Sequence, residues 1–316
     1  MIKTQTPGIR FIITSRCNYG CTYCHNEWEP KSGPKKIFDK RLIRELIVST
    51  KKLGGEEVDI TGGEPLLEIE RVKIILKVAK ELNLWTNITT NGYFLGEQAK
   101  ALKQLGLKEI HIHIPSLDSN KYKKLMKGQA DLAKVLNAIN KYKDYFEIIK
   151  INVPIFVGEN DLEIPDFVKY FNKIGITPRF IESMPTMQFK GKPQILFEDL
   201  IKKSLGEIKL ESSYLWGINK YTSKYGKFET LRCICFDRKC DLCHKTNFLH
   251  VDQNCNIRPC NLQAYRICAE RGKSLPILKK AINYLRKQKD VPKEYRDIWG
   301  LTRIPLRKLE KENNAK

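Results

Sequence analysis

Short β-branched runs alternate with longer helical patterns from residue 9 to about residue 185, and this alternation constrains the fold more than any other feature. The predicted strands are Ile9–Thr14, Val58–Thr61, Trp85–Thr90, Glu109–Ser116, Ile148–Phe156 and Pro178–Met184. The predicted helices, with apolar residues three and four positions apart, cover 38–53, 67–82, 96–105, 130–143 and 163–175. Six β/α units in series imply parallel strands joined by right-handed crossovers. We therefore predict an α/β fold, a partial (β/α)6 barrel of the TIM type.

Each notable motif of this region follows a predicted strand. The motifs are SRCNYGCTYC (15–24), TGGEP (61–65), TTNG (89–92), PSLD (115–118) and ESMP (182–185). In a β/α barrel the loops after the strands meet at one mouth, where functional groups lie. We expect these five loops to face one cavity.

The pattern changes after residue 190, which divides the chain into two predicted regions. Residues 1–190 form the barrel, and residues 191–316 form a C-terminal, cysteine-rich extension. Within the extension we predict a helix over 196–204, irregular strands over 207–235, a hairpin in 240–260 with its turn at 252–254, and a helix over 275–288. A basic helical tail ends the extension.

Ten cysteines fall into two groups, three at residues 17–24 and seven at residues 233–268. Residues 1–15 lack the apolar core of a signal peptide, and no uncharged apolar run approaches the ~18 residues that span a bilayer. We therefore expect a cytoplasmic protein without a membrane partner. Because a reducing cytosol disfavours disulfides, the two groups of cysteines indicate two metal sites.

The first group has the spacing Cys17-x3-Cys21-x2-Cys24. Three thiolates on a short loop at a barrel mouth suit an iron–sulfur cluster, and a 4Fe–4S cube held by three thiolates keeps one iron open. Zinc is the alternative, with His25 as a candidate fourth ligand. Gly62 and Gly63 have no side chains, so their backbone could approach a small ligand closely.

The CxxxCxxC spacing after the first strand, followed by GGEP after the second, resembles the radical S-adenosylmethionine (SAM) enzymes. The resemblance implies that the amino and carboxylate groups of SAM chelate the open iron. One electron would then cleave the bond from sulfur to C5′, and the 5′-deoxyadenosyl radical would take a hydrogen atom from a substrate. A flavodoxin or ferredoxin would donate the electron.

Within that superfamily, the motifs and their order resemble the GTP 3′,8-cyclase family of molybdenum cofactor biosynthesis. The matching segments lie between about Gly8 and Cys260 and include ITGGEPLLE, ITTNGYFL, SLDSNKYKKLMKG and RFIESMP. The resemblance implies that the catalytic residues, which hold the first cluster, are Cys17, Cys21 and Cys24. The residues that would contact SAM are Tyr23, Gly62, Gly63, Glu64, Asn91, Ser116 and Met184. The residues that would contact the substrate are Arg10, Thr90, Lys150 and Arg179.

In that family a second 4Fe–4S cluster, held by three C-terminal cysteines, binds the base of the substrate. Here the CDLC and NIRPC motifs supply the ligands Cys240, Cys243 and Cys260. The candidates for a fourth ligand, which would close the cluster, are Cys233, Cys235, Cys255 and Cys268. A zinc site is the alternative, because a CxxC motif followed by a later pair suits zinc.

This chain departs from the cyclase family where substrate would bind. The family has cationic side chains just before ITGGEP, whereas this chain has Glu57 and Asp59. A carboxylate beside a triphosphate is repulsive by about 1 to 4 kcal/mol. After CxxC, where arginines are expected, the chain has Lys245, Asn247 and Phe248. We therefore predict a radical SAM enzyme whose small-molecule substrate is not GTP, although nucleotide-like or otherwise anionic.

Three alternatives stay open beside this prediction. The first is a divergent GTP 3′,8-cyclase of molybdopterin biosynthesis. The second is a peptide maturase, which the cysteine-rich extension would suit. The third is an RNA-modifying enzyme, because a formal net charge of +21 and a basic tail could attract nucleic acid.

Two histidines on the fourth predicted strand are further candidates. In EIHIHI, His111 and His113 share one face, and the isoleucines share the other. The isoleucines should face the helices. We therefore expect both histidines to point toward the barrel interior.

Overall fold

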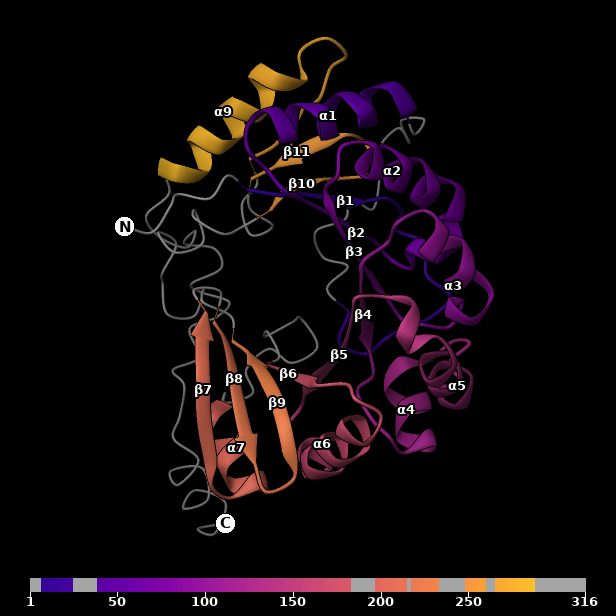
Figure 1. Cartoon of the computed structure of the whole chain (residues 1–316), viewed down its shortest axis with the longest axis vertical. Helices are drawn as coiled ribbons and strands as arrows, with labels where there is room; N and C mark the ends of the chain where they lie inside the picture. Colours follow the sequence, from indigo (N-terminus) through magenta and orange to yellow (C-terminus); the bar gives the residue numbers. More distant parts are fainter. Residues whose placement is uncertain are drawn as a thin grey trace.

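The computed structural model describes residues 7–24, 39–182, 197–214, 217–232, 248–259 and 265–287. Six parallel strands, adjacent in chain order, form the centre of the sheet (Figure 1). They are β1 (Ile9–Ile12), β2 (Glu57–Thr61), β3 (Trp85–Thr90), β4 (Glu109–His113), β5 (Ile148–Ile155) and β6 (Pro178–Glu182). The curved sheet and its covering helices confirm the partial barrel.

Helices cover the outer face of the curved sheet (Figure 1). They are α1 (Lys40–Lys52), α2 (Ile69–Glu81), α3 (Leu95–Gln104), α4 (Ser119–Met126), α5 (Leu132–Tyr142) and α6 (Ile164–Lys173), with 3-10 turns η2 (Pro65–Glu68), η3 (Lys143–Tyr145) and η4 (Asp161–Glu163). Five of these helices match the predicted ranges. The pattern missed α4, whose first turn is capped by the carboxylate of Asp118. Among the described helices, none is long and apolar enough to cross a membrane.

The C-terminal extension continues the barrel sheet at both edges. Its elements are α7 (Phe197–Leu205), β7 (Ile208–Tyr214), β8 (Ile218–Ser223), β9 (Gly226–Leu231), β10 (Leu249–Val251), β11 (Asn256–Arg258), β12 (Ile267–Cys268) and α9 (Ser274–Lys287). Strand β9 pairs in parallel with β6, and β10 pairs in parallel with β1. The sheet therefore has twelve strands, in the order β12-β11-β10-β1-β2-β3-β4-β5-β6-β9-β8-β7. The division of the chain near residue 190 stays a prediction.

Successive residues of each barrel strand face opposite sides of the sheet. Phe11 of β1 and Ile60 of β2 belong to the hydrophobic core beneath the helices. Arg10 and Asp59 alternate with them and form an ion pair on the other side, which we call the lumen. The lumen side is therefore polar, whereas the helix side is almost wholly apolar.

Candidate active site

The cysteine loop, residues 13–24, follows β1. The side chains of Cys17 and Cys24 are exposed, and that of Cys21 is half-buried. The backbone N–H of Tyr19 donates to Cys17 Sγ over 3.4 Å, and Cys24 N–H donates to the carbonyl of Cys21 over 3.2 Å. The loop therefore curls around its own thiols, and it presents two of them to solvent.

The C-terminal end of α4 supports this loop. Gly20 N–H donates to the Met126 carbonyl over 3.0 Å, and Thr22 N–H donates to the Leu125 carbonyl over 2.9 Å. The Met126 sulfur lies 3.6 Å from Cys21 Sγ and accepts a hydrogen bond from the Tyr23 hydroxyl over 2.9 Å. Sequence reasoning missed Met126, because nothing in the pattern indicated that α4 exists or that it packs against the cysteines.

The TGGE segment passes directly against the cysteine loop. Gly63 N–H donates to the Thr14 carbonyl over 2.7 Å, and Glu64 N–H donates to the Arg16 carbonyl over 2.8 Å. A Cβ atom on Gly62 would lie 2.6 Å from the Thr14 carbonyl oxygen, and one on Gly63 would lie 2.7 Å from the Arg16 carbonyl carbon. The two glycines therefore allow two loop backbones to touch, and contact with SAM stays a prediction for both.

The side chain of Glu64 joins the end of β2 to the end of β3. Its carboxylate accepts from Leu66 N–H over 3.0 Å, from the Thr90 hydroxyl over 2.7 Å and from Asn91 N–H over 2.7 Å. Burial raises the pKa of Glu64 to about 7, although these donors oppose the shift. The carboxylate and the hydroxyl of Thr90 thus have partners within the protein, and their predicted contacts with ligands stay predictions.

Asn91 connects this junction to the first cysteine. Its amide nitrogen donates to Asn18 Oδ1 over 2.8 Å and lies 3.9 Å from Cys17 Sγ. Its side-chain oxygen accepts from Tyr93 N–H over 3.0 Å. Asn91 is therefore a predicted SAM contact that lies beside Cys17.

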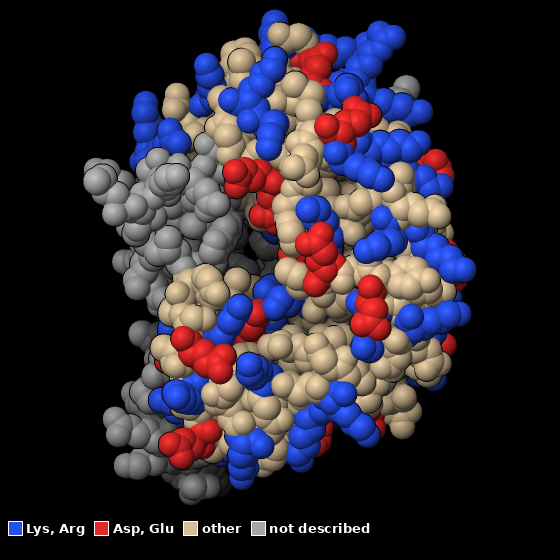
Figure 2. All heavy atoms as spheres, viewed as in Figure 1, with Lys and Arg blue, Asp and Glu red and all other residues tan. Residues whose placement is uncertain are grey.

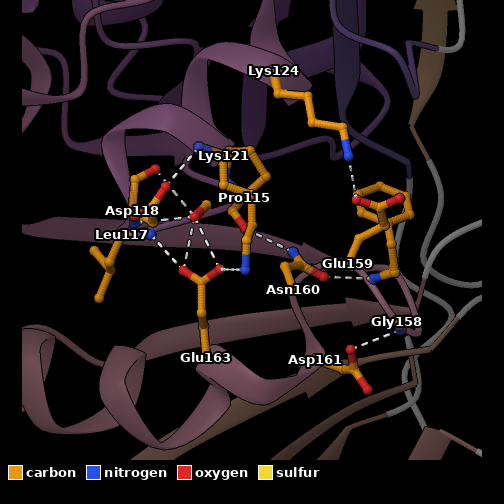
Figure 3. A network of polar contacts seen from close by, with 12 residues as sticks. Pro115, Leu117, Asp118, Lys121, Lys124, Gly158, Glu159, Asn160, Asp161 and Glu163 are labelled. Carbon is orange, nitrogen blue, oxygen red and sulfur yellow. Dashed lines mark hydrogen bonds and ion pairs between the residues drawn. The ribbon is translucent and has the colours of Figure 1, made fainter.

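Ser116 belongs to a polar network between the loops that follow β4 and β5, and Figure 3 shows this network around Glu163. Its hydroxyl donates to the Glu163 carboxylate over 2.8 Å, and Glu163 also accepts from Leu117 N–H over 2.8 Å. Lys121 completes the network with an ion pair to Glu163 of 2.7 Å. Ser116 is fully buried and has its partners within this network. Its contact with SAM stays a prediction.

Three predicted substrate residues face the lumen, and each is paired with a carboxylate. Arg10 forms an ion pair with Asp59 and lies over the ring of Phe248, 4.6 Å from its centroid. Lys150 and Arg179 both contact Glu229 of β9, over 2.6 Å and 2.9 Å. Sequence reasoning missed Glu229, because its position in the lumen depends on β9 pairing with β6.

Neighbouring strands also place six polar residues side by side across the lumen. Strand register pairs the members of this polar row in the order Arg258, His250, Arg10, Asp59, Asn87 and Glu109. The row carries arginines on β11 and β1 and carboxylates on β2 and β4. Burial lowers the pKa of His250 on β10 well below its ordinary value, so this histidine adds no positive charge. Figure 2 shows a hollow near the centre of the face of the molecule that is in view, and both acidic and basic side chains reach its rim.

The histidines of β4 lie as expected. Ile110 and Ile112 are fully buried in the helix-covered core, and His111 and His113 alternate with them. His111 Nε2 lies 2.8 Å from the Glu109 carboxylate, which also accepts from the Trp85 indole over 3.1 Å. His111 therefore belongs to the polar lining of the lumen.

Comparison with known proteins identifies the family to which this barrel and its cysteine loop belong. Residues 11–171, half of the chain, match the radical SAM superfamily. The chain belongs to the radical SAM superfamily. This membership implies a 4Fe–4S cluster and SAM as cofactors, as expected from the cysteine spacing.

Among the superfamily, the chain is similar to GTP 3′,8-cyclases. It is 37% identical to that of Aquifex aeolicus over 182 residues, which is 56% of each chain. The chain thus spans about half the length of that relative and of the Lactiplantibacillus plantarum GTP 3′,8-cyclase. The Clostridium acetobutylicum enzyme is 31% identical over 258 residues, which is 80% of each chain.

Solved radical SAM structures share the fold over most of the chain. Streptococcus suis SuiB bound to S-adenosylmethionine superimposes with a TM-score of 0.63 and 15% identity, over 89% of this chain and 68% of that one. The protein anSMEcpe with bound AdoMet and the Kp18Cys peptide superimposes with a TM-score of 0.55 and 16% identity, over 89% of this chain and 84% of that one. At these identities the likeness concerns the fold alone.

The cysteine loop of this radical SAM protein fits an iron–sulfur cluster. In the described part of the chain, no three Cys, His, Asp or Glu side chains converge on one metal ion. A cluster binds each thiolate at a different iron, so its ligands need not converge on one point. Partial desolvation raises the pKa of Cys17, and the burial of Cys21 raises the pKa of its thiol to about 12, so a positive partner such as iron would favour the thiolates.

Several predicted residues lie outside the described residues: Met184, Cys240, Cys243 and Cys260, with Cys233 and Cys235. Two other candidate ligands of the second cluster are described. Cys255 is buried in the turn between β10 and β11 with φ +58°, and Cys268 is exposed on β12. Pairing of Asn256 with Cys268 brings these two parts of the extension together.

Glu57 gives a prediction about stability and pH. Burial, with the nearby charges of Asp59 and Glu109, raises the pKa of Glu57 to about 7 from its ordinary 4.5. Between these pH values the folded chain keeps a proton that the unfolded chain has lost, so stability falls as the pH rises toward 7. Replacing Glu57 by Gln should remove about 1–3 kcal/mol of this pH dependence.

Melting temperatures of wild type and Glu57→Gln at about pH 5 and about pH 7.5 measure this difference. The control is Glu56→Gln, because Glu56 is the adjacent carboxylate and is exposed. Glu64 also has a raised pKa, so part of the pH dependence should persist in Glu57→Gln. An unchanged pH dependence in Glu57→Gln would show that Glu57 has an ordinary pKa in the folded protein.

Proposed function

We propose that this radical SAM enzyme takes a hydrogen atom from a small polar molecule bound in the lumen, and that this molecule is not GTP. One observation carries the proposal. The cations at the positions that match nucleotide contacts in the cyclase family are already paired, Arg10 with Asp59 and both Lys150 and Arg179 with Glu229. A triphosphate would have to compete with these carboxylates for each cation.

The residues of the chain have distinct parts in the proposed reaction. Cys17, Cys21 and Cys24 hold the first cluster, which with SAM supplies the 5′-deoxyadenosyl radical when both are bound. The backbone of the TGGE segment and the amide of Asn91 fix the cysteine loop at the barrel mouth. The lumen beside them orients the substrate and limits its contact with water.

We also propose a second 4Fe–4S cluster held by Cys240, Cys243 and Cys260. The β10–β11 hairpin supports the proposal, because its antiparallel pairing places the two chain segments that lead to these cysteines at one end. Parallel pairing of β10 with β1 holds that hairpin beside the lumen. A flavodoxin or ferredoxin as electron donor, and a cytoplasmic location, complete the proposal.

A divergent GTP 3′,8-cyclase is the second candidate. It is favoured by the 31% identity with the Clostridium acetobutylicum GTP 3′,8-cyclase over 80% of each chain. It is disfavoured by Glu57 and Asp59, which lie on the lumen side of β2. The two candidates share the SAM chemistry and differ in substrate.

Anaerobic reconstitution with iron and sulfide, followed by reduction with dithionite, tests the proposed function. Release of 5′-deoxyadenosine is measured with nucleotides, nucleosides, small amines and short peptides. We expect slow release without substrate and no stimulation by GTP. Stimulation by GTP together with a cyclised guanine nucleotide would establish the second candidate instead, and iron and sulfide counts distinguish one cluster from two.

A further inference from the structure

Building on the proposed function, we propose that the acidic half of the polar row binds a cationic nitrogen group of the substrate. The group is an ammonium, guanidinium or amidinium, held by Asp59 and Asn87 with Glu57 beside them. This substrate class differs from a nucleoside triphosphate and from the anionic substrate predicted from the sequence, because Arg10, Lys150 and Arg179 are already paired with carboxylates.

Two buried acceptor atoms carry the inference. Asp59 is 1% exposed and Asn87 is 3% exposed, and strand register places them opposite each other on β2 and β3. Among the described residues, neither Asp59 Oδ1 nor Asn87 Oδ1 has a hydrogen-bond partner. Buried acceptors rarely lack a hydrogen-bond partner, because a buried oxygen has lost its hydrogen bonds to water and nothing replaces them. Both atoms are acceptors, so a ligand that satisfies them must donate.

The orientation of the Asn87 side-chain amide agrees with the need for a donor. Its nitrogen donates to the carboxylate of Glu57, which leaves its oxygen directed away from that carboxylate. A neighbouring acceptor fixes an amide in this orientation, because an oxygen facing a carboxylate would be repelled. The hydrogen bond to Glu57 therefore holds the Asn87 side chain with its oxygen left as an acceptor in the row.

The charges around these atoms also favour a cation. Three carboxylates, Glu57, Asp59 and Glu109, lie on the lumen side of β2 and β4. Arg10 pairs with Asp59, and His111 contacts Glu109, but no ion pair among the described residues neutralises Glu57. The raised pKa of Glu57 has burial and the charges of Asp59 and Glu109 as its main causes. A donor group with a positive charge would relieve this repulsion.

Calorimetry on the reconstituted holoenzyme with SAM tests the proposal with matched probes. The probes are butylguanidine as the cation, butyramide as the neutral donor, butyrate as the anion, and GTP. We expect butylguanidine to bind more tightly than butyramide, and we expect no binding of butyrate or GTP. At about pH 8, above its pKa of about 7, Glu57 is ionised, so Glu57→Gln should weaken butylguanidine binding there by about tenfold or more.

Three further variants make the result specific. Asn87→Leu removes the second acceptor without adding charge and should also weaken butylguanidine binding, whereas the exposed Glu56→Gln should not. The double variant Glu57→Lys with Asp59→Arg should lose butylguanidine binding and gain GTP binding. Tighter binding of butyrate or GTP than of butylguanidine to wild type would overturn the proposal, as would an unchanged affinity in Glu57→Gln.

A failure here would remain distinct from a failure of the proposed function. Release of 5′-deoxyadenosine without substrate depends on the cysteine loop and not on the polar row. If wild type cleaves SAM but does not bind butylguanidine, the substrate class is wrong and the radical SAM chemistry stands. If wild type binds butylguanidine but never cleaves SAM, the proposed function fails.

Discussion

Alanine at any one of Cys17, Cys21 or Cys24 is expected to abolish cleavage of SAM. Each thiol is a ligand of the first cluster in the proposed function, and no other cysteine lies in the described part of this loop. Without the cluster the C5′–sulfur bond receives no electron, so 5′-deoxyadenosine release should fall by more than about a thousandfold. Chromatography of 5′-deoxyadenosine and iron and sulfide counts on the same samples measure both effects.

Two control variants separate loss of the cluster from loss of the fold. Ser15→Ala changes an exposed side chain of the same loop and should keep full activity. Cys268→Ser removes an exposed thiol that is a candidate ligand of the second cluster, so it should keep SAM cleavage without substrate even where its iron content falls. A cysteine-loop variant that retains wild-type iron content and SAM cleavage would contradict the assignment of the site.

Gly63→Ala is expected to destabilise the protein and to disrupt the cysteine loop. A Cβ at this position would lie 2.7 Å from the Arg16 carbonyl carbon and 3.0 Å from the Ser15 carbonyl carbon. These are backbone atoms of a loop that is hydrogen-bonded to the same segment, so they cannot move without breaking those bonds. We expect a loss of about 3 kcal/mol or more in stability, and a lower iron content.

The chain offers two glycines as matched controls. Gly20 lies in the cysteine loop and Gly96 lies in α3, and a Cβ on either would make an ordinary contact of 3.7 Å. Gly20→Ala should therefore leave iron content unchanged, and Gly96→Ala should stabilise its helix by about 0.5–1 kcal/mol. Thermal unfolding and iron analysis of the three variants test the argument. Equal effects of Gly63→Ala and Gly20→Ala would show that close approach of the backbones is not the reason for the glycine pair.

The charges of the lumen explain how a relative of GTP 3′,8-cyclases could take another substrate without a change of fold. Glu57 and Asp59 occupy the lumen side of β2, and Asp59 engages Arg10 of β1. Glu229 of β9 forms ion pairs with Lys150 and Arg179 at the other edge of the barrel. Asp59 and Glu229 therefore offset the charge of three cations in the lumen, and neither carboxylate belongs to the cysteine loop or to the TGGE segment.

Local pattern was enough to predict the barrel. The six strands and five of the covering helices have strong periodicity, because each packs an apolar face onto one core. The same periodicity assigned Arg10, Lys150 and Arg179 to strands, and alternation placed the histidines of β4 on the lumen side. Helix α4 was missed because it has only eight residues, and its apolar residues contact the cysteine loop as well as the core.

The sequence by itself determined the class of the enzyme, because the cysteine spacing and the glycine pair are local and lie at the ends of neighbouring strands. Only the tertiary structure decided which side chains line the lumen. Parallel pairing of β10 with β1 brings His250 and Arg258 into the lumen from more than two hundred residues along the chain. Parallel pairing of β9 with β6 brings Glu229 beside Arg179, which lies 50 residues before it. Pairings between segments so distant leave no local pattern, because the hydrogen bonds that fix them are made by backbone groups common to every residue.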